Sequence, residues 1–195
     1  MMTGGRPGCG PAPTIAAMAP ARKPTTRQPP TPRLASDPIA EAQRQWSAHG
    51  WEGASDGMAA VTSIMRAHQI YLARVEAVLR PFDVSFARYE VLMLLYFSKR
   101  GALPMRTIGS RLQVHQTSVT NAVDRLEAAR LVRRLPHPTD RRATLVEIAP
   151  AGRGLAEKAT AALNDEVFTD TGLSARGVND IVRTIGQLRR GAGDF

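Results

Sequence analysis

Two short helical patterns, separated by about three residues and followed by two β-rich runs, constrain the fold of this chain more than any other feature. The first pattern covers about residues 105–112, and the second runs from about 116 to 129. Strand-like runs then span 131–135 and 143–148. The two prolines and the aspartate between these runs are typical of a hairpin loop. This order predicts a helix-turn-helix followed by a β-hairpin wing.

The helix expected at 116–129 has two different faces. Taking 100° per residue, Thr117, Asn121 and Asp124 lie opposite the apolar side chains. The apolar face consists of Val119, Ala122, Val123 and Leu126. The run from Gln116 to Asn121 contains few good helix formers, which argues against a helix that is merely solvated on its polar side. Small polar side chains on such a helix can read base edges in the major groove, so we predict binding to double-stranded DNA.

The residues predicted to contact DNA lie at the start of this helix and in the wing. On the helix they are His115, Gln116, Thr117, Ser118, Thr120, Asn121 and Arg125. In the wing they are Arg133, Arg134, Asp140, Arg141 and Arg142. Strand arginines can contact phosphates, and an arginine on a loop can enter the minor groove. His115 is also expected to cap the helix, and a solvated basic loop is the alternative interpretation for any single arginine.

The positive charge is concentrated in two parts of the chain. The net charge is +9, and residues 99–142 carry ten Lys or Arg against three acidic residues. Residues 1–36 carry five basic residues and no acidic ones, whereas the remainder is mildly acidic. This asymmetry indicates a polyanion-binding module on a near-neutral scaffold, with solubility alone as the alternative.

Residues 1–36 are expected to be a disordered basic tail. They hold eight of the fourteen prolines and almost no large apolar side chains, so they cannot bury enough surface to offset the entropy of ordering. The single cysteine, Cys9, lies there, which excludes an intramolecular disulfide and fits a reducing cytoplasm. No apolar run approaches the roughly 18 residues of a membrane helix, so we expect a cytoplasmic protein without a membrane partner.

Long helices are predicted on both sides of the winged segment. The stripe from Met58 to Leu79 alternates spacings of three and four, which suits helix–helix packing, including packing between subunits. A second helix capped by Ser85 follows. Two further helices close the chain at about 150–169 and 174–190, the last capped by Ser174.

Four short stretches resemble the signature of the MarR family of transcription regulators. They are Thr120–Glu127, Leu131–Val132, Pro138–Ala143 and Ala151–Arg153, within a resemblance that covers about residues 58–190. The resemblance implies a mainly α fold with a small β-hairpin wing (α+β). It places a winged helix-turn-helix at 84–148 and dimerisation helices at 37–80 and 150–190, within one domain spanning 37–195.

The resemblance also implies a function. Members of the family act as homodimers that bind inverted-repeat operators, mostly as repressors. Many release DNA when a small molecule, commonly a phenolic or other aromatic anion, enters near the dimer and DNA-binding domains. No cofactor is implied, and Arg142 would be the wing arginine. One departure is Arg130, where the family usually has glycine. Because a left-handed residue other than glycine costs about 1 kcal/mol, we expect this turn to differ.

Two other functions compete with DNA binding. An enzyme is disfavoured, because none of the four histidines lies in a metal-binding or nucleophile motif. A helical dimer that binds only proteins or small molecules would not need the polar helix face and the arginine-rich wing, so this interpretation ranks below DNA binding.

Overall fold

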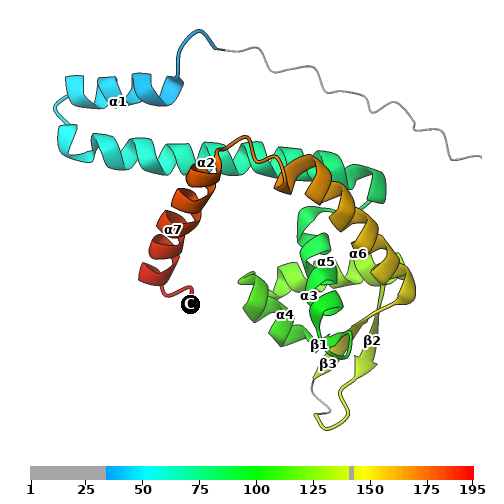
Figure 1. Ribbon diagram of the computed structural model, residues 1–195. Coiled ribbons are helices and arrows are strands. Elements are labelled where there is room, and N and C mark those ends of the chain that lie inside the picture. The colour runs from blue at the N-terminus through cyan, green and yellow to red at the C-terminus, as the bar shows by residue number, and fades with distance from the viewer. Residues whose placement is uncertain (1–33, 141–142) are drawn as a thin grey trace, which may run out of the picture. The chain divides into compact units, whose positions relative to one another are not determined.

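The computed structural model describes residues 34–140 and 143–195, which form helices and one small sheet (Figure 1). Residues 39–195 form one unit. The elements are α1 (Pro38–Ala48), α2 (Glu52–Leu79), a 3-10 turn (Arg80–Phe82), α3 (Phe86–Phe97), β1 (Ala102–Pro104), α4 (Met105–Leu112), α5 (Gln116–Ala128), β2 (Val132–Pro136), β3 (Thr144–Ile148), α6 (Pro150–Leu163), a π turn (Asn164–Phe168) and α7 (Ala175–Gly191). The predicted mainly α fold with a wing is confirmed. Of the tail predicted to be disordered, residues 1–33 lie outside the described part.

The helices begin where the sequence provides caps. The Ser85 hydroxyl accepts the main-chain N–H of Arg88, and the Ser174 hydroxyl accepts that of Gly177 at 3.1 Å. Both caps satisfy donors that the first turn of a helix leaves without a partner. The predicted starts of α3 and α7 are therefore confirmed.

The core of the winged segment lies where α3, α4, α5 and the sheet meet. Its side chains come from every one of these elements, and the fully buried ones include Leu92, Leu95, Ile108, Val123, Leu126 and Val146. On α5, Val119, Val123 and Leu126 are at most 1% exposed, as the periodicity predicts. In the described ranges, no helix is both long enough and apolar enough to cross a membrane.

The sheet has three antiparallel strands in the order β1-β3-β2. Strand β3 lies in the centre, with Glu147 opposite both Ala102 of β1 and Arg133 of β2. The hairpin of β2 and β3 is the predicted wing. Strand β1 is not predicted, because Ala-Leu-Pro is too short to show an alternating pattern and its pairing depends entirely on β3.

The turn between α5 and β2 adopts the left-handed conformation that a glycine would take. Arg130 has φ +58°, so the expectation of a different turn is wrong. The Leu131 N–H donates to Leu126 O at 2.9 Å, and the Arg130 N–H donates to Glu127 O at 2.8 Å. This is the Schellman pattern that satisfies the last carbonyls of a helix. It also turns Leu131 into the core, where it is buried.

Helix α6 starts against this turn. The Ala149 N–H donates to Leu131 O at 2.9 Å. A Cβ atom at Gly152 would lie 2.1 Å from the same oxygen and 3.0 Å from Ile148. The close approach of α6 to the turn therefore requires a residue without a side chain at position 152.

We expect Gly152→Ala to lower the free energy of unfolding by about 1–3 kcal/mol, the range typical of overpacking. The matched control is Gly154→Ala in the same helix, where a Cβ would meet nothing within 4 Å. That change should instead stabilise the protein by up to about 1 kcal/mol through helix propensity. Urea unfolding of both variants measures the difference, and equal stabilities would contradict the proposed contact.

Candidate nucleic-acid interface

The start of α5 presents a row of exposed polar side chains. His115 is the N-cap, and its Nδ1 atom accepts the main-chain N–H of Thr117 at 3.3 Å. The predicted cap is thereby confirmed. The side chains of Gln116, Thr117 and Ser118 are exposed in the first turn. These polar groups therefore lie at the positive end of the helix dipole and face solvent.

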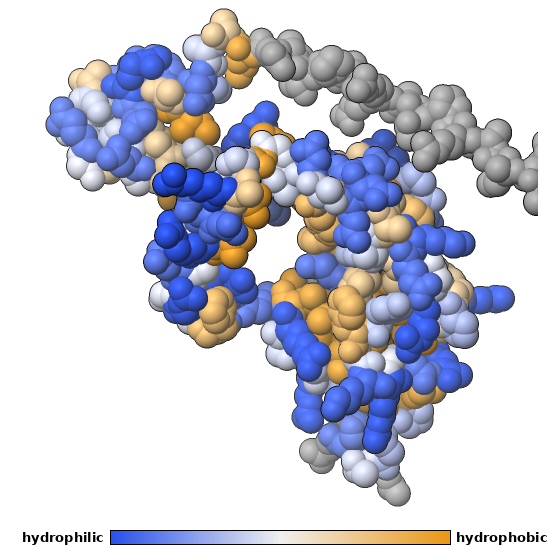
Figure 2. Space-filling view, in the orientation of Figure 1, coloured by the Kyte–Doolittle hydropathy of each residue, from blue (hydrophilic) through white to orange (hydrophobic). Residues whose placement is uncertain are grey.

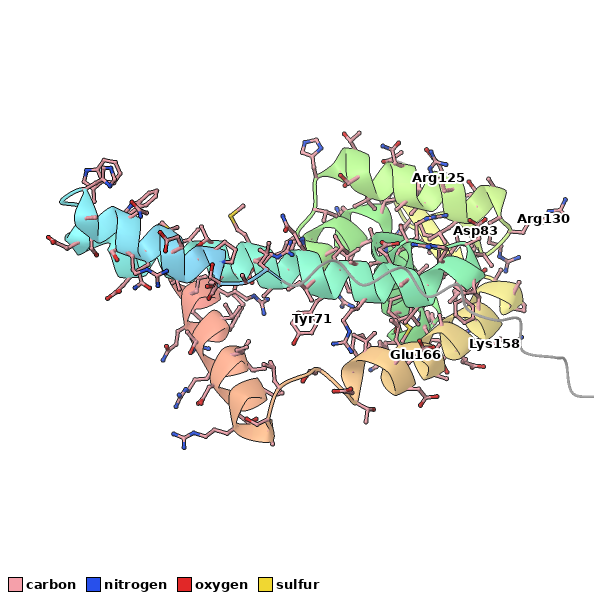
Figure 3. All side chains as sticks on the ribbon, turned by 90° about the horizontal axis from the view of Figure 1, so that it is seen from above. Tyr71, Asp83, Arg125, Arg130, Lys158 and Glu166 are labelled. Carbon is pink, nitrogen blue, oxygen red and sulfur yellow. The ribbon has the colours of Figure 1, made fainter. Side chains whose placement is uncertain are left out.

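Further along α5, the structure distinguishes the predicted contact residues by whether their side chains already bond within the protein. Across the described ranges, the side chains of Asn121 and Arg125 form no hydrogen bond or ion pair, and both are exposed. Figure 3 shows Arg125 on α5, with Arg130 extending past the end of that helix. The Thr120 hydroxyl is half-buried and donates to Gln116 O at 3.0 Å, so it is partly used within the helix.

The wing loop is closed by its own hydrogen bonds. The His137 N–H donates to Ala143 O at 3.3 Å, and the Ala143 N–H donates to Asp140 O at 3.0 Å. The His137 Nδ1 atom also accepts the main-chain N–H of Asp140 at 3.1 Å. His137 therefore shapes the approach to the predicted wing arginines. Arg141 and Arg142 themselves lie outside the described residues.

The two arginines of β2 have different surroundings. Arg133 is exposed and pairs with Glu147 on the neighbouring strand. Arg134 is 27% exposed and binds two carboxylates of α5, Asp124 at 2.6 Å and Glu127 at 2.5 Å. Burial lowers the pKa of the Arg134 guanidinium, but its bonds to these carboxylates outweigh that effect and raise the pKa above its ordinary value. The acidic partners of Arg134 are not predicted from the sequence, because nothing in the pattern sets the angle between α5 and the wing.

The residues that follow α7 contact the turn of the helix-turn-helix. Gln113 lies between α4 and α5 with φ +54°, and its side-chain amide donates to Asp194 O at 2.7 Å. The Asp194 carboxylate pairs in turn with Arg189 of α7. This contact is not predicted from the sequence, since 81 residues separate its two ends.

Two helices carry exposed apolar side chains outside the winged segment. On α2 the predicted stripe is buried only near its end, at Val75, Val78 and Leu79. Earlier positions of that stripe are exposed: Val61, Ile64, Met65 and Leu72. Helix α7 likewise exposes Ile181, Val182 and Leu188, and Figure 2 shows hydrophobic surface along it. Such patches mark sites of association.

A pocket of about 310 Å³ lies between α3 and α6. Its lining is mostly apolar, and comprises Met93, Tyr96, Phe97, Ala156, Glu157, Thr160, Ala161 and Asn164. The Tyr96 hydroxyl donates to Glu157 at 3.0 Å, and this bond to a carboxylate raises the pKa of Tyr96. No pattern in the sequence indicates which residues form this pocket.

Comparison with known proteins agrees with this geometry. The model of the MarR family matches residues 82–143. Sco5413, a MarR family transcriptional regulator from Streptomyces coelicolor, is 48% identical, with a TM-score of 0.67 over 72% of this chain and 97% of that one. A mutant of E. coli MarR solved with operator DNA is 22% identical, with a TM-score of 0.61 over 65% of this chain and 91% of that one.

A curated relative matches over a shorter stretch. The HTH-type transcriptional regulator MhqR of Bacillus subtilis (strain 168) is 40% identical over 82 residues. These residues are 42% of this chain, and they span half the length of MhqR.

The fold and the exposed face of α5 define a winged helix-turn-helix protein. With the match to Sco5413 over nearly its full length, the chain belongs to the MarR family of transcriptional regulators. That family consists of regulators rather than enzymes, in agreement with the sequence-based expectation.

Proposed function

We propose that this protein is a homodimeric repressor that binds an inverted-repeat operator in double-stranded DNA. The observation that carries the proposal is the polar face of α5. Its buried side holds the helix in place, while Asn121 and Arg125 are exposed without a partner in the described part of the chain. The solved E. coli MarR mutant of the same fold is described in complex with operator DNA.

The chemistry of α5 suits recognition of base edges. An asparagine amide can donate to and accept from adenine at the same time, and glutamine can do the same. Gln116 and Asn121 provide these groups, while Thr117 and Ser118 can contact bases or phosphates. Arg125, one turn after Asn121, adds a positive charge for the DNA backbone or for guanine.

The wing supplies the second half of the proposed contact. Arg133, Asp140, Arg141 and Arg142 are proposed to act there, with a loop arginine entering the minor groove. The phosphate contact predicted for Arg134 is left out of this proposal. Its guanidinium already binds two carboxylates of α5.

The proposed dimer rests on the apolar faces of α2 and α7. Ile181, Val182 and Leu188 are 49–67% exposed, although large aliphatic side chains at helical spacing normally pack. A twofold dimer would present two copies of α5 about one helical turn of DNA apart, roughly 34 Å. This spacing is the reason to expect an inverted repeat of roughly 16–20 base pairs.

We expect Asn121→Ala to weaken binding to a duplex selected by the wild-type protein by about 1–3 kcal/mol, while leaving binding to an unrelated duplex nearly unchanged. Arg125→Ala should weaken both duplexes and lower the slope of log affinity against log salt by about one for each phosphate that is no longer neutralised. Fluorescence anisotropy titrations at several salt concentrations measure both effects.

The control for charge removal is Lys158→Ala on α6, which Figure 3 shows on a different helix from Arg125. It should change neither affinity nor slope. Equal effects of the Arg125 and Lys158 variants, or no salt-sensitive binding by the wild-type protein to any duplex, would refute the proposed interface.

We expect Val182→Glu to dissociate the dimer, because it places a charge in the proposed apolar interface. Gln187→Glu adds the same charge about 140° away around α7, on its polar side, and should leave the dimer intact. Analytical ultracentrifugation distinguishes these outcomes. A wild-type protein that sediments as a monomer at micromolar concentration would overturn the dimer proposal.

The effector implied by family resemblance is proposed to bind between α3 and α6. The pocket volume lies in the lower range of ligand sites, and its lining is mostly apolar. Because the Glu157 carboxylate faces it, a neutral aromatic molecule fits better than an anion.

We therefore expect phenol at neutral pH to bind this pocket and to weaken DNA binding, whereas benzoate should do so less. Ala161→Leu, at the pocket lining, should reduce the effect of phenol, and Ala151→Leu, on the same helix outside the lining, should not. Calorimetry and DNA competition measure both. Tighter binding of benzoate than of phenol would exclude this pocket as the proposed site.

A further inference from the structure

Arg134 connects the two elements that are proposed to read DNA. It lies on β2 of the wing, and its guanidinium reaches across to α5. Nη2 donates to the Asp124 carboxylate at 2.6 Å, and Nη1 donates to the Glu127 carboxylate at 2.5 Å. The main-chain N–H of Arg134 donates to the other oxygen of Glu127 at 2.9 Å. Three hydrogen bonds thus join one residue of the wing to one face of α5, the proposed recognition helix.

The spacing of the two carboxylates explains why one arginine can bind both. Asp124 and Glu127 are three residues apart, which places them on the same side of α5. They lie in the last half of the helix, where the dipole disfavours negative charge. The planar guanidinium has donors on both sides and can satisfy two carboxylates at once. Because Arg134 is only 27% exposed, these charge-assisted bonds are screened less than those of a fully exposed pair.

The neighbouring arginine provides an internal contrast. Arg133 points to the other face of the sheet, as successive strand residues do, and it pairs with Glu147 of β3. That pair stays within the hairpin and is 65% exposed on the arginine side. Of the two, only Arg134 links the wing to α5.

We propose that Arg134 is a positioning residue that fixes the wing relative to the recognition helix, and that it does not contact DNA itself. This inference rests on the proposed DNA-binding function. If the wing is held at one angle to α5 before DNA binds, both elements already face adjacent grooves. Binding then costs less conformational entropy. Release of Arg134 toward a phosphate would leave Asp124 and Glu127 unneutralised beside the polyanion, which opposes such a contact.

The first experiment requires no DNA. Hydrogen exchange of the free protein should show faster exchange in β2 and β3 for Arg134→Met, with exchange in α2, α3 and α6 unchanged. Arg133→Met is the matched control and should leave the exchange of α5 and the wing close to wild type. Arg134→Lys retains the charge but cannot bind both carboxylates in the same way, so its exchange rates in β2 and β3 should lie between those of the wild type and Arg134→Met. This variant also tests the inference if Arg134→Met does not fold. Uniform acceleration across the whole chain, or no difference between the Arg133 and Arg134 variants, would overturn the inference.

The second experiment uses a double-mutant cycle with a duplex selected by the wild-type protein. The variant Asp124→Asn/Glu127→Gln removes two negative charges near the DNA. It would bind DNA more strongly if only long-range electrostatics counted. If the two carboxylates hold Arg134 in place, this variant should instead bind at least about fivefold more weakly, and adding Arg134→Met should weaken binding little further.

The opposite pattern would overturn the inference. A phosphate contact by Arg134 predicts stronger binding for the carboxylate variant, followed by weaker binding and a salt slope lower by about one when Arg134→Met is added. If the wild-type protein binds no duplex, the proposed function fails, but the exchange experiment still tests whether Arg134 fixes the wing.

Discussion

The buried face of α5 is the constraint on which the rest of the structure depends. Val119, Val123 and Leu126 are packed into the core with at most 1% exposure, so α5 cannot rotate about its axis without exposing them. Fixing one face of a helix also fixes the other. Asn121 and Arg125 therefore face solvent because of apolar packing on the far side, and not because of any contact of their own.

The end of α5 transfers this fixed orientation to the wing and to α6. Arg130 accepts a left-handed conformation so that Leu131 can turn back into the core, and the carbonyl of Leu131 then receives the N–H of Ala149. Gly152 allows α6 to approach the same carbonyl. The helix proposed to read DNA, the wing and the helix that leads toward α7 thus meet at one turn, in which Leu131 is the buried residue. Arg134 adds a polar link between α5 and the wing on the outside of this turn.

Helix α2 makes hydrogen bonds to the segment that precedes α7. Helix α2 is anchored near its C-terminal end, where Tyr71 donates to Thr171 O at 2.8 Å and Arg74 donates to Asp170 O at 2.7 Å. Arg74 also donates to Glu166 O of the π turn at 3.1 Å, and Figure 3 shows Tyr71 and Glu166 on the two segments that this bond joins. The earlier side chains Val61, Ile64 and Met65 are exposed. Large exposed apolar patches are rare on monomeric proteins and mark sites of association, so this surface supports the proposed dimer.

Much of this protein was determined by its sequence alone. Helical periodicity is a local property, so the buried and exposed faces of α5, the caps at His115, Ser85 and Ser174, and the two strands of the wing could be predicted from residues close together in the chain. Three features could not. Strand β1 exists only because β3 pairs with it, Arg130 is held left-handed by the packing of Leu131, and Arg134 meets Asp124 and Glu127 only at the angle that the core imposes. Each of these features is a contact between elements. Its geometry depends on how the whole core packs, so no periodic pattern in the sequence indicates it.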